Sequence, residues 1–421
     1  MKYVVILGDG MADYRQPFLG NKTPLMLAKK PNIDALCKKS VAGLCKTIPD
    51  GMKPGSDVAN LSVLGYDPKI CYTGRSPLEA ASIGIQLKDT DVTARANLVT
   101  LSDEDNFEDK KMIDYSAGEI STEEAKILIS YLAEKLNNDK IKLYAGISYR
   151  HCLVIDNGKI AGDLTPPHDI TGKPVNGHLP TSDIGKLYLD LMKKSVELLK
   201  DHPVNKERIK QGKNPATSLW FWGEGTKPRL ESFEKRYGLK GCMISAVDLL
   251  KGIGSLTGMR VVEVDGATGN YDTNFSGKAA ACLSALKDGC DFVYIHMEAP
   301  DECGHHGDAE HKIYSIEQID EKVVGPVVEG LKKSGEDFHI LICPDHPTPV
   351  SIMTHCSDPV PFVMYKSERE AAEQNGAGKN GADGKNGADQ IGKVLSYDED
   401  SVKNSGVYIG SGVELMREFL K

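Results

Sequence analysis

Three mostly apolar runs recur along the chain, at residues 2–7, 292–297 and 338–343. Apolar runs of this length are typical of strands buried on both faces of a parallel sheet. Between the last two runs, residues 313–331 carry apolar positions at helical spacing. The alternation of strand, helix and strand therefore predicts an α/β fold, in which polar functional groups lie at the carboxyl ends of the strands.

Residues between the first two runs show a different pattern. Residues 93–100 and 149–155 read as strands, and residues 121–136 read as a helix with a Ser/Thr-rich start followed by Glu. A further helix at residues 186–199 is expected to lead back to the first domain. We therefore predict a discontinuous core of residues 1–60 and 190–421, with a smaller α+β domain inserted at residues 61–189.

Length, charge and composition narrow the class of protein. A chain of 421 residues exceeds what one hydrophobic core usually supports, which favours two domains. The net charge of −9 argues against nucleic acid or an anionic membrane as a partner. No apolar run approaches the length of a membrane span, and the N-terminus lacks the features of a signal peptide. Ten cysteines without C-x-x-C spacing suggest reduced thiols, so we expect a cytoplasmic protein.

One segment has a composition that cannot form a core. Residues 375–390 contain three Asn-Gly-Ala repeats with Gly, Lys and Asp between them. We predict a flexible surface loop there.

Acidic and histidine side chains follow each apolar run closely: Asp9 after the first, Asp301 and His305 after the second, and Asp345, His346 and His355 after the third. Each motif alone could be a solvated loop, but all of them end a strand of the buried type. A mixture of carboxylate and imidazole suits Mn²⁺, Zn²⁺ or Mg²⁺ better than Ca²⁺. Ligands gathered at strand ends in this way predict a two-metal site, a common device for phosphoryl transfer.

Ser56 opens a predicted helix after a turn rich in Gly and Pro at residues 49–54. It could serve as the helix N-cap, a frequent role for serine. It could also be a nucleophile, because the N-terminus of a helix attracts phosphate. The residues alone leave both interpretations open.

Together these segments resemble the archaeal-type cofactor-independent phosphoglycerate mutases of the alkaline phosphatase superfamily. The matching stretches are residues 8–11, 55–68, 72–77, 149–151, 167–169, 202–205, 222–225 and 300–307. They run through most of the chain in one order, so the resemblance is specific. It implies an alkaline-phosphatase-like, doubly wound, mostly parallel α/β sheet with the inserted smaller α+β domain.

The resemblance also implies a ligand set and a reaction. One divalent metal would be held by Asp9, Ser56, Asp345 and His346, and a second by Asp301, His305 and His355. Mn²⁺ is the expected metal, with Mg²⁺, Zn²⁺ and Co²⁺ as alternatives. Ser56 would take the phosphoryl group from 3-phosphoglycerate, and the 2-hydroxyl of the retained glycerate would take it back. The enzyme would thus be a 2,3-bisphosphoglycerate-independent isomerase of glycolysis and gluconeogenesis.

A small phosphorylated three-carbon acid needs cationic groups to bind its carboxylate and phosphate, and arginine suits both. The candidates in the inserted domain are Arg75, Arg95, Arg150, His151 and His168. Each arginine could instead form a surface ion pair. The inserted domain is the natural lid to keep glycerate from escaping between the two steps. The sequence leaves open whether the chain forms a homo-oligomer.

Two other functions compete with this one. The first is another metal-dependent phosphotransferase or phosphatase of the same superfamily, including a homoserine-kinase-like activity. A kinase needs a nucleotide site, and the chain has no G-x-x-x-x-G-K-[ST] loop. The second is a non-catalytic, metal-stabilised binding protein, which would be expected to lack some of the seven ligand positions.

Overall fold

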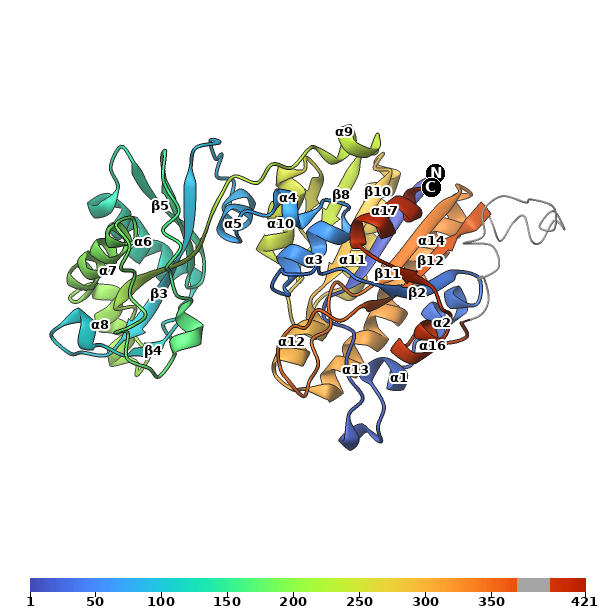
Figure 1. Ribbon diagram of the computed structural model, residues 1–421, viewed down its shortest axis with the longest axis horizontal. Coiled ribbons are helices and arrows are strands. Elements are labelled where there is room, and N and C mark those ends of the chain that lie inside the picture. The colour runs from blue at the N-terminus through green and yellow to red at the C-terminus, as the bar shows by residue number, and fades with distance from the viewer. Residues whose placement is uncertain (369–393) are drawn as a thin grey trace. The chain divides into compact units, whose positions relative to one another are not determined.

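The computed structural model describes residues 1–368 and 394–421, so the repeat at 375–390 lies outside the described residues. The chain divides into two compact units (Figure 1). Unit 1 comprises Met1–Tyr72 and Arg229–Lys421, and unit 2 comprises Thr73–Pro228. Within the described ranges, no helix is both long and apolar enough to cross a membrane.

Both boundaries of unit 2 lie later in the chain than the predicted 60/61 and 189/190, which corrects that prediction. Helix α3 (Ser56–Val63) packs against α10 (Asp248–Leu256) and α17 (Gly412–Leu420) of unit 1, so the chain enters unit 2 only after α3. Helix α7 (Gly185–Leu199) was expected to lead back to the core. It packs instead on β7 (Ser218–Thr226), a strand of unit 2, so the chain returns only after that strand.

Unit 1 is built on an eight-stranded sheet with the order β13-β2-β12-β11-β1-β10-β8-β9. The strands are β1 (Lys2–Gly8), β2 (Val41–Cys45), β8 (Gly241–Ile244), β9 (Arg260–Val262), β10 (Phe292–Met297), β11 (Phe338–Cys343), β12 (Val360–Lys366) and β13 (Tyr408–Ile409). Strand β1 pairs in parallel with both β10 and β11, and β12 runs antiparallel to β11 and β2. The three predicted apolar runs are thus three adjacent strands, as an α/β sheet requires.

Helices cover both faces of this sheet, which explains why β1, β10 and β11 are apolar on both sides (Figure 1). The helices of unit 1 include α1 (Pro24–Leu27), α2 (Pro31–Cys37), α4 (Pro68–Cys71), α9 (Phe233–Tyr237), α10 (Asp248–Leu256), α11 (Phe275–Lys287), α12 (Ala299–His305), α13 (Ala309–Gln318), α14 (Gly325–Ser334), α16 (Glu399–Lys403) and α17 (Gly412–Leu420). Helices α2, α11, α13 and α14 share one hydrophobic core with the sheet. Helices α3, α10 and α17 cover the other face. The sheet is therefore doubly wound.

Unit 2 is a five-stranded antiparallel sheet with helices. Its strands are β3 (Val92–Leu101), β4 (Met112–Asp114), β5 (Ile141–Ile147), β6 (Arg150–Ile155) and β7, and its helices are α5 (Ser76–Ser82), α6 (Thr122–Leu136), α7 and α8 (Pro203–Lys210). The order is β4-β3-β6-β5, and β7 pairs with β3. Helix α6 begins with the predicted capping box, formed by Ser121 and Glu124. Residues of α6 and α7 form the main core on one face, and α5 packs on the other.

Strand register decides which side chains of unit 2 share a face. Arg95 lies opposite Cys152, and Asn97 lies opposite Arg150. Ala96 lies opposite His151. Because successive residues of a strand point to opposite faces, Arg95, Asn97 and Arg150 share the face of α5, while His151 points to the α6 and α7 side.

Candidate active site

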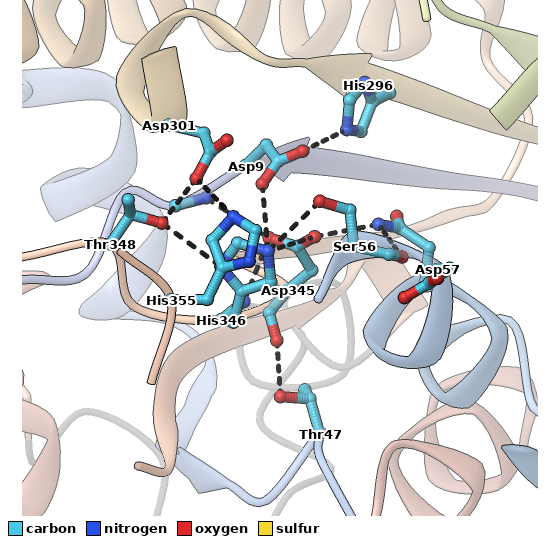
Figure 2. Close-up of polar contacts among 12 residues, drawn as sticks. Asp9, Thr47, Ser56, Asp57, His296, Asp301, Asp345, His346, Thr348 and His355 are labelled. Atoms are coloured by element: carbon cyan, nitrogen blue, oxygen red, sulfur yellow. Dashed lines mark hydrogen bonds and ion pairs between the residues drawn. The ribbon is translucent and has the colours of Figure 1, made fainter. Parts of the chain in front are cut away.

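The predicted ligands of unit 1 converge at one edge of the sheet (Figure 2). Asp9 follows β1, Asp345 and His346 follow β11, and Asp301 lies on α12, directly after β10. These strands are parallel neighbours, so their carboxyl ends meet. All four side chains are buried, with exposed fractions from 0% to 4%.

The first group of ligands surrounds the imidazole of His346. Its Nε2 lies 3.5 Å from Asp9 Oδ1, 3.4 Å from Asp345 Oδ2 and 3.1 Å from Ser56 Oγ. Ser56 is the first residue of α3, and the N-cap position belongs to Gly55. Its hydroxyl therefore points at the ligand group instead of capping the helix, which removes the N-cap interpretation.

The second group lies around Asp301. Its Oδ2 is 3.3 Å from His305 Nε2, and its Oδ1 is 3.5 Å from His355 Nε2. The two histidine Nε2 atoms are 2.9 Å apart. His305 Nδ1 lies 3.1 Å from the carbonyl of Met353, which accepts a hydrogen bond from the Nδ1–H group. His346 also lies within 4.8 Å of the ligand atoms of Asp301 and His355, so it stands between the groups.

Further residues hold the ligands in place. His296 Nε2 lies 2.8 Å from Asp9 Oδ2, and its Nδ1 lies 3.2 Å from Ser245 Oγ. Asn60 donates to Asp345 Oδ2 at 2.8 Å and accepts a hydrogen bond from the Tyr294 hydroxyl at 2.6 Å. Partners of this kind orient metal ligands and tune their basicity.

Sequence reasoning missed these supporting residues, although signals for them exist. Tyr294 and His296 are polar side chains at alternate positions of an otherwise apolar strand. Asn60 lies one helical turn after Ser56, on the same side of α3. Thr348 Oγ1 donates to Asp301 Oδ1, and nothing in its loop sequence indicates that contact.

The electrostatics of the ligand groups favour a bound cation. Burial, followed by the charges of Asp345 and Asp301, raises the pKa of Asp9 well above its ordinary value. Asp9 Oδ1 is buried and makes no hydrogen bond with any described residue. Burial would also raise the pKa of Asp301, but hydrogen bonds with His305 and His355 outweigh it and lower the pKa. Close, buried carboxylates with an orphan oxygen fit divalent metal ions, so these are candidate metal-binding groups.

Unit 2 contains a cluster of arginines around the carboxylate of Glu79. Its Oε1 lies 2.9 Å from Arg75 Nε, and its Oε2 lies 3.0 Å from Arg95 Nε. Burial would raise the pKa of Glu79, but the charges of Arg95, Arg75 and Arg150 outweigh it and lower the pKa. We call these four residues the arginine cluster. Three guanidinium groups and one carboxylate leave a net positive charge, so the cluster can attract an anion.

Aromatic and amide side chains support the arginine cluster. The Arg95 guanidinium lies 4.1 Å from the ring centre of Trp222, and Trp222 Nε1 donates to Asn97 Oδ1 at 3.0 Å. The ring centre of His168 is 5.0 Å from that of Trp222. His168 therefore lies beside the arginine cluster.

His151 does not join the other predicted substrate residues. Its side chain points to the opposite face of the sheet, where it is buried and its Nδ1 accepts a hydrogen bond from the Gly146 N–H at 3.0 Å. Burial lowers the pKa of His151 to about 3, so the ring is neutral. The adjacent motif residues Arg150 and His151 cannot both face one ligand, because strand neighbours alternate.

A serine hydroxyl at a helix N-terminus, beside two groups of candidate metal ligands at the carboxyl ends of a doubly wound sheet, is typical of metal-dependent phosphoryl-transfer proteins. The family model of 2,3-bisphosphoglycerate-independent phosphoglycerate mutase matches residues 37–205. The chain belongs to this family, as the sequence motifs predicted, because its similarity to named members extends over nearly the whole chain.

Individual relatives support this membership. The chain is 49% identical to the 2,3-bisphosphoglycerate-independent phosphoglycerate mutase of Methanosarcina barkeri, over 94% of this chain and 99% of that protein. It is 46% identical to the probable mutase of Geobacter sulfurreducens, over 100% of both chains.

Two solved structures resemble the whole fold. The PH0037 protein of Pyrococcus horikoshii matches with a TM-score of 0.78 and 28% identity, over 100% of this chain and 97% of that one. The cofactor-independent phosphoglycerate mutase of Thermoplasma acidophilum matches with a TM-score of 0.61 and 26% identity, over 100% and 99% of the two chains.

Proposed function

We propose that this protein is a 2,3-bisphosphoglycerate-independent phosphoglycerate mutase, which interconverts 3-phosphoglycerate and 2-phosphoglycerate through a phosphoserine at Ser56. The proposal rests mainly on the position of Ser56 Oγ, which lies 3.1 Å from His346 Nε2. The carboxylates of Asp9 and Asp345 approach the same imidazole. Relatives 45–50% identical to the chain and bearing that name support the choice of substrate.

Ser56 is well placed to act as the nucleophile. The N-terminus of α3 offers backbone N–H groups and a positive dipole, both of which favour a phosphate. Asn60 donates to the Ser56 carbonyl at 2.8 Å and so steadies this turn of the helix. When bound by the two ligand groups, divalent cations supply the positive charge that lowers the pKa of the serine hydroxyl and neutralises the phosphoryl oxygens. We propose Mn²⁺, with Mg²⁺, Zn²⁺ and Co²⁺ as alternatives.

The reaction then has two balanced halves. Ser56 Oγ loses its proton and attacks the phosphorus of 3-phosphoglycerate, the bond from phosphorus to the 3-oxygen breaks, and that oxygen takes up a proton. In the second half, the 2-hydroxyl of glycerate loses its proton and attacks the phosphoserine, the bond from phosphorus to Ser56 Oγ breaks, and Oγ takes up a proton. Glycerate has to stay bound throughout, because water would otherwise hydrolyse the phosphoserine.

We assign the binding of glycerate to unit 2, where Arg75, Arg95 and Arg150 offer guanidinium groups and His168 lies nearby. Arginine binds carboxylate in a bidentate manner, which holds both position and orientation. Glu79 and Trp222 restrain Arg95, so little ordering is needed on binding. The role of unit 2 as a lid is part of this proposal.

We also propose that the protein is cytoplasmic. All ten cysteines are unpaired, which supports the cytoplasm, where thiols stay reduced.

The test of the proposed function is the formation of 2-phosphoglycerate from 3-phosphoglycerate with Mn²⁺ and without bisphosphoglycerate. We expect turnover to 2-phosphoglycerate with little release of inorganic phosphate. Release of phosphate alone would instead identify a phosphatase. Ser62→Ala serves as the matched control, since Ser62 is buried in the same helix but makes no hydrogen bond through its hydroxyl within the described ranges. It should retain activity.

A further inference from the structure

Thr348 touches both groups of candidate metal ligands. It lies two residues after His346, and its side chain is fully buried. Its Oγ1 is 3.2 Å from His346 Nδ1 and forms a hydrogen bond with Asp301 Oδ1 (Figure 2). His346 belongs to the first group and Asp301 to the second. A single hydroxyl therefore connects a ligand of each group.

The chemistry of the three side chains sets the direction of these hydrogen bonds. A hydroxyl has one proton to donate, and an ionised carboxylate can only accept. Thr348 therefore donates to Asp301, and its lone pair accepts the Nδ1 proton of His346. His346 Nε2 is then the unprotonated nitrogen, and it is the atom that faces Ser56 Oγ at 3.1 Å.

The surrounding backbone is built to hold Thr348 in this position. Lys312 Nζ donates to the Thr348 carbonyl at 2.8 Å and pairs with Asp13 Oδ2 at 2.8 Å, and both charged side chains are fully buried. The Thr348 N–H donates to the Ala12 carbonyl at 3.3 Å. The loop is thus tied to α13 and to the segment after β1.

Two glycines leave the space that Thr348 needs. A Cβ atom on Gly10, whose φ is +60°, would lie 2.6 Å from Thr348 Oγ1. A Cβ atom on Gly304 would lie 2.3 Å from the Thr348 carbonyl oxygen. Any side chain at either position would displace the bridging threonine, so its environment is shaped around it.

We propose that Thr348 is a positioning residue that links the two metal-binding groups. It fixes the His346 tautomer that binds metal through Nε2, and it orients the Asp301 carboxylate for the second metal. This inference rests on the proposed two-metal function. Loss of an outer partner of a ligand typically weakens metal affinity about 10–100-fold. Because Thr348 serves a ligand of each group, removing its hydroxyl should weaken both sites.

The test measures Mn²⁺ binding by titration calorimetry in two backgrounds. Asp345→Asn disables the first group and reports the second, while His305→Ala disables the second and reports the first. In each background, Thr348→Val removes the hydroxyl at nearly constant size, and Thr348→Ser restores it. We expect Thr348→Val to raise the Kd for Mn²⁺ about 10–100-fold in both backgrounds, and Thr348→Ser to stay close to the parent.

Matched controls separate bridging from general damage. Thr257→Val changes an equally buried threonine, whose hydroxyl donates only to carbonyls of its own helix, and it should leave Mn²⁺ binding unchanged. His296→Ala removes a partner of Asp9 alone and should weaken only the first site. Thr348→Ala is carried alongside, so that a folding defect of the valine variant does not end the test.

The outcomes distinguish this inference from the proposed function. Unchanged Mn²⁺ binding by folded Thr348→Val and Thr348→Ala, or weakening in one background only, would overturn the bridging role while leaving the mutase intact. A wild-type protein that binds no Mn²⁺ would instead overturn the two-metal function itself.

Discussion

Glu79 offers a quantitative prediction, because it lies between two arginines in a largely buried setting. The side chains of Arg95 and Glu79 are 6% and 17% exposed, and their charged atoms are 3.0 Å apart. Removing one partner of a fully buried pair costs about 3–5 kcal/mol. Glu79 is partly exposed, and Gln keeps one acceptor oxygen. We therefore expect Glu79→Gln to lower the free energy of unfolding of unit 2 by about 2–3 kcal/mol.

The same change should reduce catalysis. Glu79 contacts the Nε atoms of both Arg75 and Arg95, so its loss removes their shared anchor, although the stack on Trp222 remains. Misplacement of a substrate-binding group by about 1 Å can cost about 10²-fold in rate. We expect kcat/KM for 3-phosphoglycerate to fall about 10–100-fold.

Both effects can be measured in one protein preparation. The only two tryptophans, Trp220 and Trp222, lie in unit 2, so tryptophan fluorescence during urea unfolding reports that unit. Catalysis is followed by coupling 2-phosphoglycerate to enolase. Glu134→Gln is the matched control: its pair with Lys135 is exposed to solvent, so the change should leave the stability of unit 2 close to that of the wild type. If Glu79→Gln matched this control in stability and retained wild-type kcat/KM, the arginine cluster would not be organised by Glu79.

Further predictions concern the metal groups, the substrate and the core. Chelation should abolish mutase activity and Mn²⁺ should restore it, with weaker metal retention in Asp345→Asn or His305→Ala; activity in a metal-free protein would contradict this. Arg150→Ala should raise the ratio of inorganic phosphate to 2-phosphoglycerate, with Arg150→Lys in between, and an unchanged ratio with unchanged kinetics would remove Arg150 from the site. Lys312→Met should destabilise unit 1 by about 3–5 kcal/mol in chemical unfolding, because it leaves the buried Asp13 carboxylate without its cationic partner, and a wild-type midpoint would refute that reasoning.

Much of unit 1 was predictable because its central strands are buried on both faces. Such strands appear as mostly apolar runs, so the acidic residues that follow them, such as Asp9 and Asp345, are easily recognised. The supporting contacts were not predictable in the same way. The bond from His296 to Asp9 depends on which strands are neighbours, and the bond from Thr348 to Asp301 depends on how two loops meet.

Unit 2 shows where a sequence motif misleads. Arg150 and His151 are consecutive, and both side chains could bind an anionic substrate. Because successive residues of β6 point to opposite faces of the sheet, the two side chains cannot reach the same ligand. The predicted domain boundary near residue 190 was wrong for a related reason. The apolar face of α7 indicates that it covers a sheet, but which of two sheets depends on β7, a strand later in the chain.

The central claim is that Ser56 carries the phosphoryl group between the two half-reactions. The most direct measurement is acid quenching of the Mn²⁺-loaded enzyme during turnover of 3-phosphoglycerate, followed by mass spectrometry of the peptide that contains Ser56. We predict phosphate on Ser56 in the wild-type protein, and neither phosphate nor mutase activity in a folded Ser56→Ala variant. Full mutase activity in Ser56→Ala, or phosphate trapped on another residue, would contradict the account.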